Sequence, residues 1–398
     1  MIYQPPRMKF GIFLAPFHRH WENPTLSLER DLQLIEWLDE LDYDEAWIGE
    51  HHSAGWETIA SPEVFMGVAA QRTRRIMLGT GVVSLPYHHP LMVANRMVLL
   101  DHLTRGRVML GVGPGALLSD AQMLGITPTR QREMMEESLG VIMRLLTETE
   151  PITHESDWFK LVNATLHLRS YTKPHLPIAV ASVQSPAGVT LAGKYGVGVL
   201  SLGVMVGLRG AVDPKAQWAI AEETAAKHGK TMDRAEWRIV TPVHVAETKK
   251  QALEDIRPGA LEYVKMYWED ALGNKRHVPD PDNEATLIDQ LVESGQWIVG
   301  SPDDCIKGIE RLQEVTGGFG GLLVRAQEYV EPAKSRRSYE LLARYVMPRF
   351  QGSIQSLGDS YDRVVANVAE TRAQGQAAIE RAHQAYEQTF NQSDRRRG

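Results

Sequence analysis

Short apolar segments alternate with longer amphipathic segments along most of the chain. Residues 9–16 (KFGIFLAP) are apolar and end in proline, which predicts a buried strand, and the charged, amphipathic residues 26–41 predict a helix. The same alternation continues beyond them at a nearly regular spacing. The predicted strands are 9–16, 45–49, 75–84, 107–112, 177–182, 197–202, 237–246 and 321–326. The predicted helices are 26–41, 61–71, 91–103, 131–148, 186–195, 214–228, 248–272, 284–293, 301–315 and 338–345.

Strands that alternate with helices in this way require a parallel sheet with helical crossovers, and their number fits a (β/α)8 TIM barrel. A doubly wound open sheet is the alternative arrangement. We expect the barrel in residues 1–350, with a β-hairpin excursion at about 150–175 and a polar insertion at about 247–300. Residues 351–398 are poor in large apolar side chains, and we expect a helical C-terminal arm that packs on a neighbouring subunit or frays. Within it, residues 361–390 predict one amphipathic helix.

The charge balance and the cysteine content narrow the class of protein. The chain has 43 Lys and Arg against 50 Asp and Glu, a net charge of −7, which argues against nucleic acid as a partner because phosphate binding needs a basic face. Its one cysteine, Cys305, cannot form an internal disulfide or a cysteine-based metal cluster, and it fits a reducing compartment. The first apolar run is too short for a signal peptide, and no stretch of about 18 apolar residues could span a membrane. We therefore expect a cytoplasmic protein.

Histidines gather on one predicted face. In a parallel barrel the loops after the strands form one end, and this end carries the active site. The histidines there are His18, His20, His51, His52, His88 and His89. Histidine is the usual acid–base group near neutral pH and a common metal ligand, but loop histidines also serve only as caps. Glu50-His51-His52 is not the zinc motif His-Glu-x-x-His, and adjacent residues at a strand end point in opposite directions. We therefore expect one of the two histidines to face a pocket, and we expect no metal.

Three loops offer candidate cofactor contacts. Residues 111–115 (GVGPG) lack the GxGxxG spacing of a dinucleotide site and are typical of a tight turn with positive φ. Residues 181–186 (ASVQSP) place hydroxyl side chains directly before a predicted helix, whose free N–H groups suit a cofactor phosphate, although simple N-capping explains the same residues. Arg132, near the start of another helix, could add a positive charge. In residues 79–86 (GTGVVSLP) the glycines would admit a flat ring or an unusual peptide geometry, or serve only close packing at the rim.

A set of motifs, in order, resembles the bacterial-luciferase-like family of flavin monooxygenases. The motifs run from residue 8 to about residue 349, and they are MKFGIFLAPF, EAWIGEHHSAGW, RIMLGTGVVSLPYHHPLMVANRMVLLDHLTRGRVMLGVGPGA, REMMEES, PIAVASVQSPAGVTLAGKYGVGVLS and GGLLVRA. The resemblance is closest to the limonene 1,2-monooxygenase-like group, in which FLAPFH, WIGEHHSAGWE, SLPYHHP and HLTRGRVMLGVGPGAL recur.

The resemblance implies an α/β fold, the (β/α)8 barrel, and an enzyme that uses FMN in its reduced form (FMNH2) together with O2. In the family a separate NAD(P)H-dependent flavin reductase supplies FMNH2, and the oxygenase is often a homo-oligomer. By motif, His51 matches the active-site histidine. Gly81 and Val82 match a cis peptide on the third strand that lies against the flavin ring. The further cofactor contacts expected are Gly113, Arg132, Ser182 and Ser185.

The chain also departs from bacterial luciferase. Pro114 stands where luciferase has an arginine, Ser182 stands where it has a glutamate, and its reactive cysteine near the fourth strand is absent. These differences weaken any expectation of bioluminescence. The side chains expected to face the substrate are apolar or aromatic, which suits a neutral, hydrophobic, terpene-like molecule. They are Phe17, Trp21, Trp56, Tyr87 and Leu117.

The chemistry that the resemblance implies proceeds through a flavin C4a-(hydro)peroxide. Its protonated form is an electrophile that epoxidises an alkene or hydroxylates an activated carbon, and its deprotonated form attacks a carbonyl, as in Baeyer–Villiger oxidation. His51 could set that protonation state near pH 7, and we favour epoxidation. Two other functions stay open: hydride transfer by a deazaflavin on the same fold without O2, and a non-catalytic flavin-binding subunit.

Overall fold

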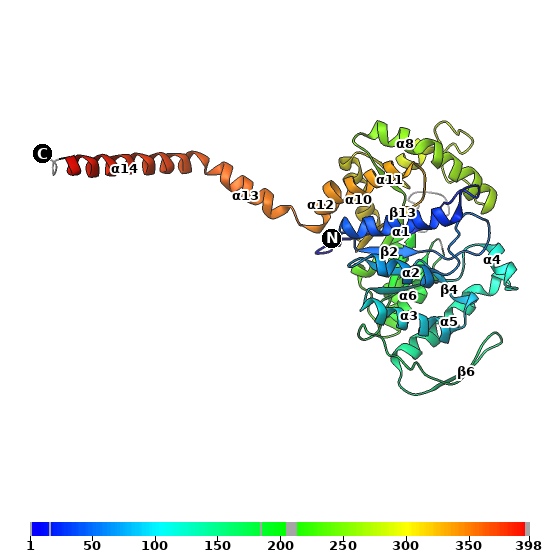
Figure 1. Cartoon of the computed structure of the whole chain (residues 1–398). Coiled ribbons are helices and arrows are strands. Elements are labelled where there is room, and N and C mark those ends of the chain that lie inside the picture. The colour runs from blue at the N-terminus through cyan, green and yellow to red at the C-terminus, as the bar shows by residue number, and fades with distance from the viewer. Residues whose placement is uncertain (1, 16, 184, 204–212, 395–398) are drawn as a thin grey trace. The chain divides into compact units, whose positions relative to one another are not determined.

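Parallel strands close into a barrel in the first of two units, Met1–Gln351 and Gly352–Gly398 (Figure 1). The computed structural model describes residues 2–15, 17–183, 185–203 and 213–394. In order around the barrel the strands are β1 (Lys9–Leu14), β2 (Glu45–Ile48), β3 (Met77–Thr80) with β4 (Val83–Ser84), β5 (Val108–Gly113), β8 (Ile178–Ser182), β9 (Gly198–Leu202), β10 (Trp237–Thr241) and β13 (Gly321–Ala326). β1 pairs with β13 and β3 pairs with β5, so the sheet is closed. The predicted (β/α)8 fold is confirmed, and the doubly wound sheet is wrong.

Helices cover the outside of the barrel, because each βα unit returns the chain along the outer face (Figure 1). They are α1 (Pro24–Glu40), α2 (Pro62–Arg72), α3 (Pro90–Thr104), α5 (Gln131–Thr147), α6 (Ala187–Tyr195), α7 (Pro214–Lys227), α10 (Pro302–Thr316) and α11 (Pro332–Leu341). Most of them begin with proline, whose fixed φ suits the first helical turn. The Ser301 hydroxyl accepts from Asp304 N at 3.3 Å, and the Asp304 carboxylate accepts from Ser301 N at 2.9 Å, a capping box that starts α10.

Inward-facing side chains fill the barrel in layers, since alternate residues of a strand point to the same side. The middle layer is apolar and buried, and it consists of Phe13, Trp47, Met109, Ala179, Leu200, Val240 and Leu323. Below it, at the N-terminal ends of the strands, Arg238 donates to both oxygens of Glu45 at 2.6 and 2.7 Å. Both side chains are 2% exposed, so a buried ion pair closes this end. The C-terminal end, which we call the mouth, carries the loops that follow the strands.

The predicted strand 237–246 is divided in the structure into β10 and β11 (Val243–Val245). Pro242 stands between them and has no N–H to donate to a strand ladder. β11 leaves the barrel and pairs in parallel with β12 (Ile298–Gly300), a strand that the sequence pattern did not predict. The prediction of one continuous strand is therefore wrong at this point.

Inserted segments interrupt the alternation of barrel strands and outer helices at several points. They are the short helix α4 (Leu118–Met123) after β5, the antiparallel pair β6 (Ile152–Glu155) and β7 (Lys160–Ala164), and the segment with α8 (Lys249–Glu262), the π-helical η4 (Tyr263–Ala271) and α9 (Leu287–Glu293). The predicted helix 248–272 thus continues from an α-helix into a π-helix rather than as one regular helix. This π-helical segment places tyrosines at the mouth, as described below.

The second unit contains two helices, α13 (Gln355–Ala366) and α14 (Val368–Asp394). The prediction of a single helix over 361–390 is wrong, because the regular backbone is interrupted at Asn367 (φ −106°, ψ 6°). The side-chain amide of Asn367 donates to Arg363 O at 2.8 Å, a local bond that competes with the regular helix. Side chains from 352 to 388 are exposed.

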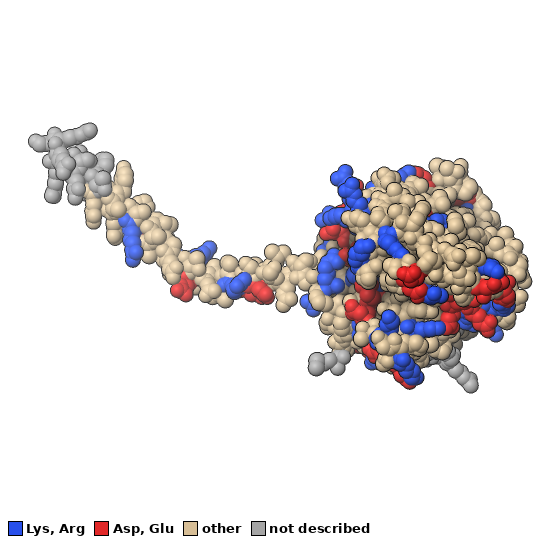
Figure 2. All heavy atoms as spheres, turned by 90° about the horizontal axis from the view of Figure 1, so that it is seen from below, with Lys and Arg blue, Asp and Glu red and all other residues tan. Residues whose placement is uncertain are grey.

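Acidic and basic side chains are interspersed over the visible face of the barrel unit in Figure 2. Within the described parts of the chain, no helix has both the length and the apolar character needed to cross a membrane.

Candidate active site

The inward-facing layer at the mouth is nearly free of side chains on five neighbouring strands. Its residues there are Ala15, Gly49, Gly81, Gly111 and Ala181. A Cβ added at Gly81 would lie 2.9 Å from the Cβ of Trp47, and one at Gly111 would lie 2.1 Å from the backbone oxygen of Thr80. Trp47 in the layer below and the backbone of β3 therefore leave room only for glycine at these two positions. The result is a flat floor, on which a planar ring can lie against backbone atoms.

The predicted strand 75–84 is divided at this floor into β3 and β4, and the Gly81–Val82 peptide bond between them is cis. The cis bond expected from the family resemblance is therefore confirmed. Gly113 on the neighbouring β5 lies against this segment, since a Cβ there would be 2.5 Å from Val82 Cγ2. Gly113 thus makes room for Val82, and contact of Gly81, Val82 and Gly113 with a cofactor stays a prediction.

His51 follows β2, and its ring lies between two carboxylates. Nε2 is 3.0 Å from Glu57 Oε2, and Nδ1 is 3.3 Å from Asp120 Oδ2. Burial alone would lower the pKa of the imidazolium, but Glu57 and Asp120 outweigh burial and raise the pKa to about 10. In this arrangement His51 therefore keeps its proton at neutral pH. A role of His51 in setting the protonation state of the reacting group stays a prediction.

Asp120 ties His51 to the loop that follows β5. Its other oxygen accepts from the backbone N–H of His52 at 3.1 Å and from the hydroxyl of Ser53. Burial would raise the pKa of the Asp120 carboxyl, but the bonds from His51 and Ser53 outweigh burial and hold this pKa below its usual value. The carboxylate is therefore ionised and fixes the loop after β2 against α4.

Glu57 links His51 to the π-helical segment. Its Oε1 accepts from the hydroxyl of Tyr267, while its Oε2 faces His51. Burial would raise the pKa of the Glu57 carboxyl, but the charge of His51 and the bonds from His51 and Tyr267 lower it, with a further contribution from Arg325 at the end of β13. Each oxygen of this buried carboxylate therefore has its own partner: Oε1 accepts from Tyr267 of the π-helical segment, and Oε2 lies against His51 of the loop after β2.

Glu50 lies on the other side of the β2 end, and its side chain is buried. Oε1 is 3.1 Å from His52 Nε2 and 2.5 Å from His88 Nε2, and Oε2 accepts from Ser84 N at 2.6 Å. Burial would raise the pKa of the Glu50 carboxyl, but the two histidines and the Ser84 N–H outweigh burial and lower it. Because Ser84 belongs to β4, Glu50 fastens the strand that follows the cis peptide to the end of β2.

The serine loop after β8 leads directly into α6, which has no side-chain cap among the residues that the structure describes. Ser182 Oγ is buried and has no hydrogen-bond partner among the described residues, whereas Ser185 is partly exposed. Gly188 brings the first turn of α6 close to β8, since a Cβ there would lie 2.4 Å from Ala181 O. An orphaned buried hydroxyl beside uncapped helix N–H groups suits a phosphate. These donors therefore fit the phosphorylated cofactor that the resemblance implies.

Arg132 lies on the first turn of α5 and is exposed. α5 and α6 lie side by side, since a Cβ added at Gly140 would be 2.8 Å from Tyr195 Oη. Lys194 of α6 also pairs with Glu136 of α5, with Nζ 2.7 Å from Oε1. Contact of Arg132 with a cofactor phosphate stays a prediction.

The predicted substrate contacts divide into buried and exposed positions. Phe17 and Trp56 are buried and stacked, with ring centroids 4.4 Å apart. Tyr263 and Tyr267 of the π-helical segment meet Phe17 edge-on at 5.3 and 6.0 Å. Trp21 is 56% exposed, and its ring is 6.0 Å from that of Trp56. The structure thus gathers Phe17 and Trp56 beneath the inserted segment and leaves Trp21 at the outer edge of this aromatic cluster.

Tyr87 and Leu117 lie on the loops after β4 and β5. Leu117 is buried at the start of α4. The side-chain amide of Gln131 donates to Tyr87 Oη at 3.1 Å and to Pro114 O at 2.8 Å, which ties both loops to α5. Burial raises the pKa of Tyr87 to about 12, so its hydroxyl stays neutral.

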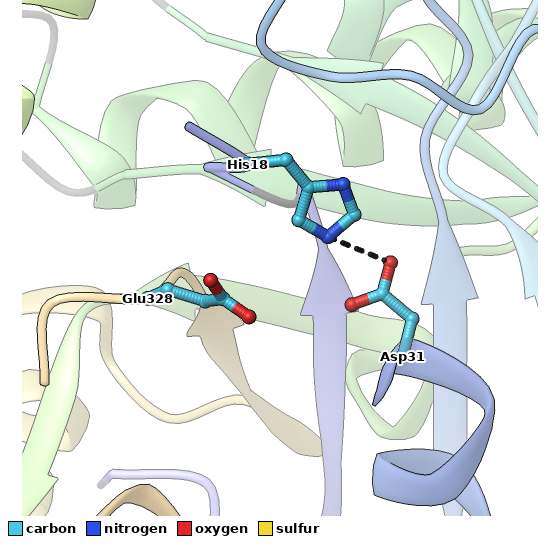
Figure 3. A group of neighbouring side chains, drawn as sticks. All are labelled: His18, Asp31 and Glu328. Atoms are coloured by element: carbon cyan, nitrogen blue, oxygen red, sulfur yellow. Dashed lines mark ion pairs between the residues drawn. The ribbon is translucent and has the colours of Figure 1, made fainter. Parts of the chain in front are cut away.

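A second cluster of titratable side chains joins the loop after β1, α1 and the loop after β13 (Figure 3). His18 Nε2 is 3.1 Å from Asp31 Oδ2, and Glu328 lies close enough that one ligand atom of each residue falls within 4.8 Å of the others. Arg30, however, engages both oxygens of Glu328. Since the Glu328 carboxylate is committed to the guanidinium of Arg30, the cluster is better described as a buried ion-pair network than as a metal site.

The partners of His51 were not found from the sequence. They are Glu57 and Asp120, with Tyr267 and Arg325 beyond them. Arg325 did carry a usable signal, because a charged residue at the C-terminal end of an otherwise apolar barrel strand is typical of an active site. Tyr267 carried none, since it lies in an insertion without a family motif.

Known proteins share this architecture. The family model described as luciferase-like monooxygenase matches residues 8–317. The 4-hydroxyprotoasukamycin monooxygenase of Streptomyces nodosus subsp. asukaensis is 50% identical over 368 residues, which are 92% of this chain and 99% of that protein. Limonene 1,2-monooxygenase of Rhodococcus erythropolis is 45% identical over 383 residues, 96% of each chain. A similar solved structure is the oxygenating constituent of 3,6-diketocamphane monooxygenase from Pseudomonas putida, a type II Baeyer–Villiger monooxygenase in complex with FMN. Its TM-score is 0.73 at 25% sequence identity, and the match covers 86% of this chain and 98% of that chain. The chain therefore belongs to the luciferase-like monooxygenase family and is a monooxygenase, as its sequence motifs predict.

Proposed function

We propose that this chain binds reduced FMN at the mouth and uses O2 to insert one oxygen atom into a hydrophobic small molecule, with epoxidation of a terpene-like alkene as the favoured reaction. The observation that carries the proposal is the side-chain-free floor around Gly81 and Gly111, with the cationic His51 above it. A planar cofactor needs such a surface, and a solved relative of this fold binds FMN. Bound reduced FMN would supply the electrons that activate O2.

The serine loop would hold the phosphate of the cofactor. The Ser182 hydroxyl lacks a partner among the described residues, and the first N–H groups of α6 lack a side-chain cap. A phosphate would accept hydrogen bonds from the Ser182 hydroxyl and from these N–H groups, and the positive end of the α6 dipole would stabilise its negative charge. Arg132, on the first turn of the neighbouring α5, would add a positive charge.

His51 would act through a fixed positive charge. Glu57 and Asp120 keep a proton on each ring nitrogen at neutral pH. A cation in a site from which water is excluded stabilises negative charge that develops on an oxygen atom during its transfer. Since Nδ1 bonds to Asp120 and Nε2 lies 3.0 Å from Glu57, His51 releases a proton only if one of these carboxylates moves away.

The aromatic cluster supports a neutral, hydrophobic substrate. Phe17 and Trp56 stack beneath Tyr263 and Tyr267, so this side of the mouth excludes water. Apolar and aromatic linings with few polar groups suit an apolar ligand. The limonene 1,2-monooxygenase that is 45% identical to this chain supports a terpene as the first substrate to test.

We further propose a separate NAD(P)H-dependent flavin reductase as the source of FMNH2, and a homo-oligomer in the cytoplasm. The buried free thiol of Cys305 suits a reducing compartment. α13 exposes Leu357, Tyr361 and Val364 by 65–69%, and apolar side chains in such a row suit a subunit contact. Light scattering after size exclusion would then give a multiple of 44.6 kDa, whereas the mass of one chain would contradict the oligomer.

Anaerobic titration with reduced FMN, followed by O2 and limonene, tests the proposal. The wild type should bind reduced FMN and form an oxygenated product in proportion to the flavin oxidised. His51→Gln should retain most of the affinity but yield less product per flavin, with the balance as hydrogen peroxide. His102→Gln, a change of an exposed histidine at the end of α3, should match the wild type.

Three results would contradict parts of this account. Tight binding of a reduced deazaflavin but not of reduced FMN would favour the hydride-transfer function. Product formation only after addition of a second chain would favour the non-catalytic subunit. An unchanged product yield in His51→Gln would remove the role assigned to that side chain.

A further inference from the structure

Arg325 is the one charged side chain in the inward-facing layer at the mouth, among the residues that the structure describes. On β9, β10 and β13 that layer continues with Leu202, Pro242 and Arg325, each two positions beyond a middle-layer residue. The register with β10 supports this placement, since Val240 pairs with Leu323 and Thr241 with Val324, which puts Pro242 beside Arg325. The guanidinium is therefore rooted at the level of the floor, across the barrel from Gly81 and Gly111.

The guanidinium is held by the inserted segment and by the loop after β13. Burial would lower the pKa of Arg325, but the hydroxyls of Tyr263 and Tyr329 and the charge of Glu57 outweigh burial and raise it. Its Nη2 also lies 4.0 Å from the position of a Cβ at Gly203, whose φ is +98°. A positive φ favours glycine, and the missing side chain leaves room for the guanidinium at the end of β9.

Glu57 does not use up the donors of Arg325. One oxygen of this carboxylate faces His51, and the other accepts from Tyr267. A guanidinium has five N–H donors, arranged as a planar fork. Arg325 is thus a fixed cation, beside a surface that fits a planar ring, with donor capacity that Glu57 does not fill.

We propose that Arg325 determines the preference of the site for the reduced cofactor, by facing the N1–C2=O edge of the isoalloxazine ring. This inference rests on the proposed function. Reduced flavin ionises at N1 and carries its negative charge along that edge, whereas oxidised flavin is neutral there. A positive charge near N1 is one of the ways in which a protein tunes a flavin. Arg325 therefore favours binding of the anionic reduced ring over the oxidised ring, which suits an enzyme that receives its flavin already reduced.

The size of the effect follows from the kind of contact. A hydrogen bond to a charged group corresponds to roughly a 10- to 100-fold change in binding. Because binding and reduction are linked, each tenfold preference for the reduced form raises the midpoint potential of bound FMN by about 30 mV for a two-electron couple. Loss of Arg325 should lower the potential of bound FMN correspondingly.

Dissociation constants of oxidised and anaerobically reduced FMN, measured for the wild type and for Arg325→Met, test the inference. Arg325→Met should weaken the binding of reduced FMN roughly 10- to 100-fold and leave that of oxidised FMN nearly unchanged. Arg325→Lys keeps the charge and should retain part of the preference. Arg19→Met is the matched control, because Arg19 pairs with Glu262 outside the floor, and it should leave both constants unchanged.

The outcomes separate this inference from the proposed function. A wild type that binds neither form of FMN would contradict the proposed function itself. A wild type that binds reduced FMN, with an Arg325→Met variant that changes both constants equally or neither, would overturn only the role of Arg325. If Arg325→Met does not fold, the absorption spectrum of reduced FMN bound to the wild type still decides. Below the pH at which free reduced FMN ionises, the bound flavin should keep the spectrum of the anion, and the spectrum of the neutral form would overturn the inference.

Discussion

Replacing His51 by glutamine is expected to destabilise the barrel most at low pH and least near pH 10. The imidazolium lies 3.0 Å from Glu57 and 3.3 Å from Asp120. These contacts raise its pKa from 6.5 to about 10, an interval that corresponds to about 5 kcal/mol at about 1.4 kcal/mol per pH unit. This value agrees with the roughly 3–5 kcal/mol of stability that is lost when one partner of a buried ion pair is removed.

The sign of the pH dependence follows from the direction of the shift. The folded protein holds the His51 proton more tightly than the unfolded chain does, so the stabilisation is fully present below the unfolded pKa of 6.5 and is lost as the pH rises toward 10. Denaturant titrations followed by tryptophan fluorescence, at pH values of about 6, 8 and 10, would measure the free energy of unfolding. The deficit of the variant should be about 3–5 kcal/mol at the lowest pH and should approach zero at the highest.

The exposed His102 provides the control for this experiment, since His102→Gln should show no such trend. A deficit of His51→Gln that is the same at all three pH values would refute the reasoning, because it would mean that the variant loses packing rather than an ion pair. A second check uses Glu57→Gln. This variant removes the negative charge that faces His51, so its free energy of unfolding should depend less on pH than that of the wild type.

Three further substitutions test individual contacts. Gly113→Ala places a Cβ 2.5 Å from Val82 Cγ2, and we expect a loss of about 1–3 kcal/mol of stability together with weaker FMN binding, measured by thermal unfolding and by titration. Tyr267→Phe removes the donor to Glu57 Oε1 and should cost about 1–3 kcal/mol, and an unchanged melting temperature would contradict the hydrogen bond. Ser301→Ala removes the cap of α10 and should cost about 1 kcal/mol without any change in FMN affinity.

The barrel was predictable because its strands are buried on both faces and therefore stand out as short apolar runs between amphipathic helices. The last strand was predicted at its observed bounds, and β2 within one residue. The breaks were harder to predict. Pro242 marks the end of β10 in the sequence, but only the paired β12, far along the chain, shows that the next residues leave the barrel. The break at Asn367 depends on a local side-chain bond that periodicity does not show.

Only those residues of the candidate site that belong to a family motif could be predicted from the sequence. His51 and the Gly81–Val82 peptide stand in family motifs, whereas the ionisation of His51 depends on Asp120, which lies 69 residues away. The second contact of Glu57, with Tyr267, spans 210 residues. A histidine without these partners would titrate near neutral pH. The fold therefore decides the charge at the centre of the site, and neither composition nor spacing reveals it.

Turnover under 18O2 tests the central claim most directly. The protein, reduced FMN and limonene would be mixed with labelled O2 in unlabelled water, and the product would be analysed by mass spectrometry. A monooxygenase built on this site should place one 18O atom in the epoxide and the other in water. Oxidation of FMN with all of the label recovered in hydrogen peroxide, or a product that carries unlabelled oxygen, would contradict the account.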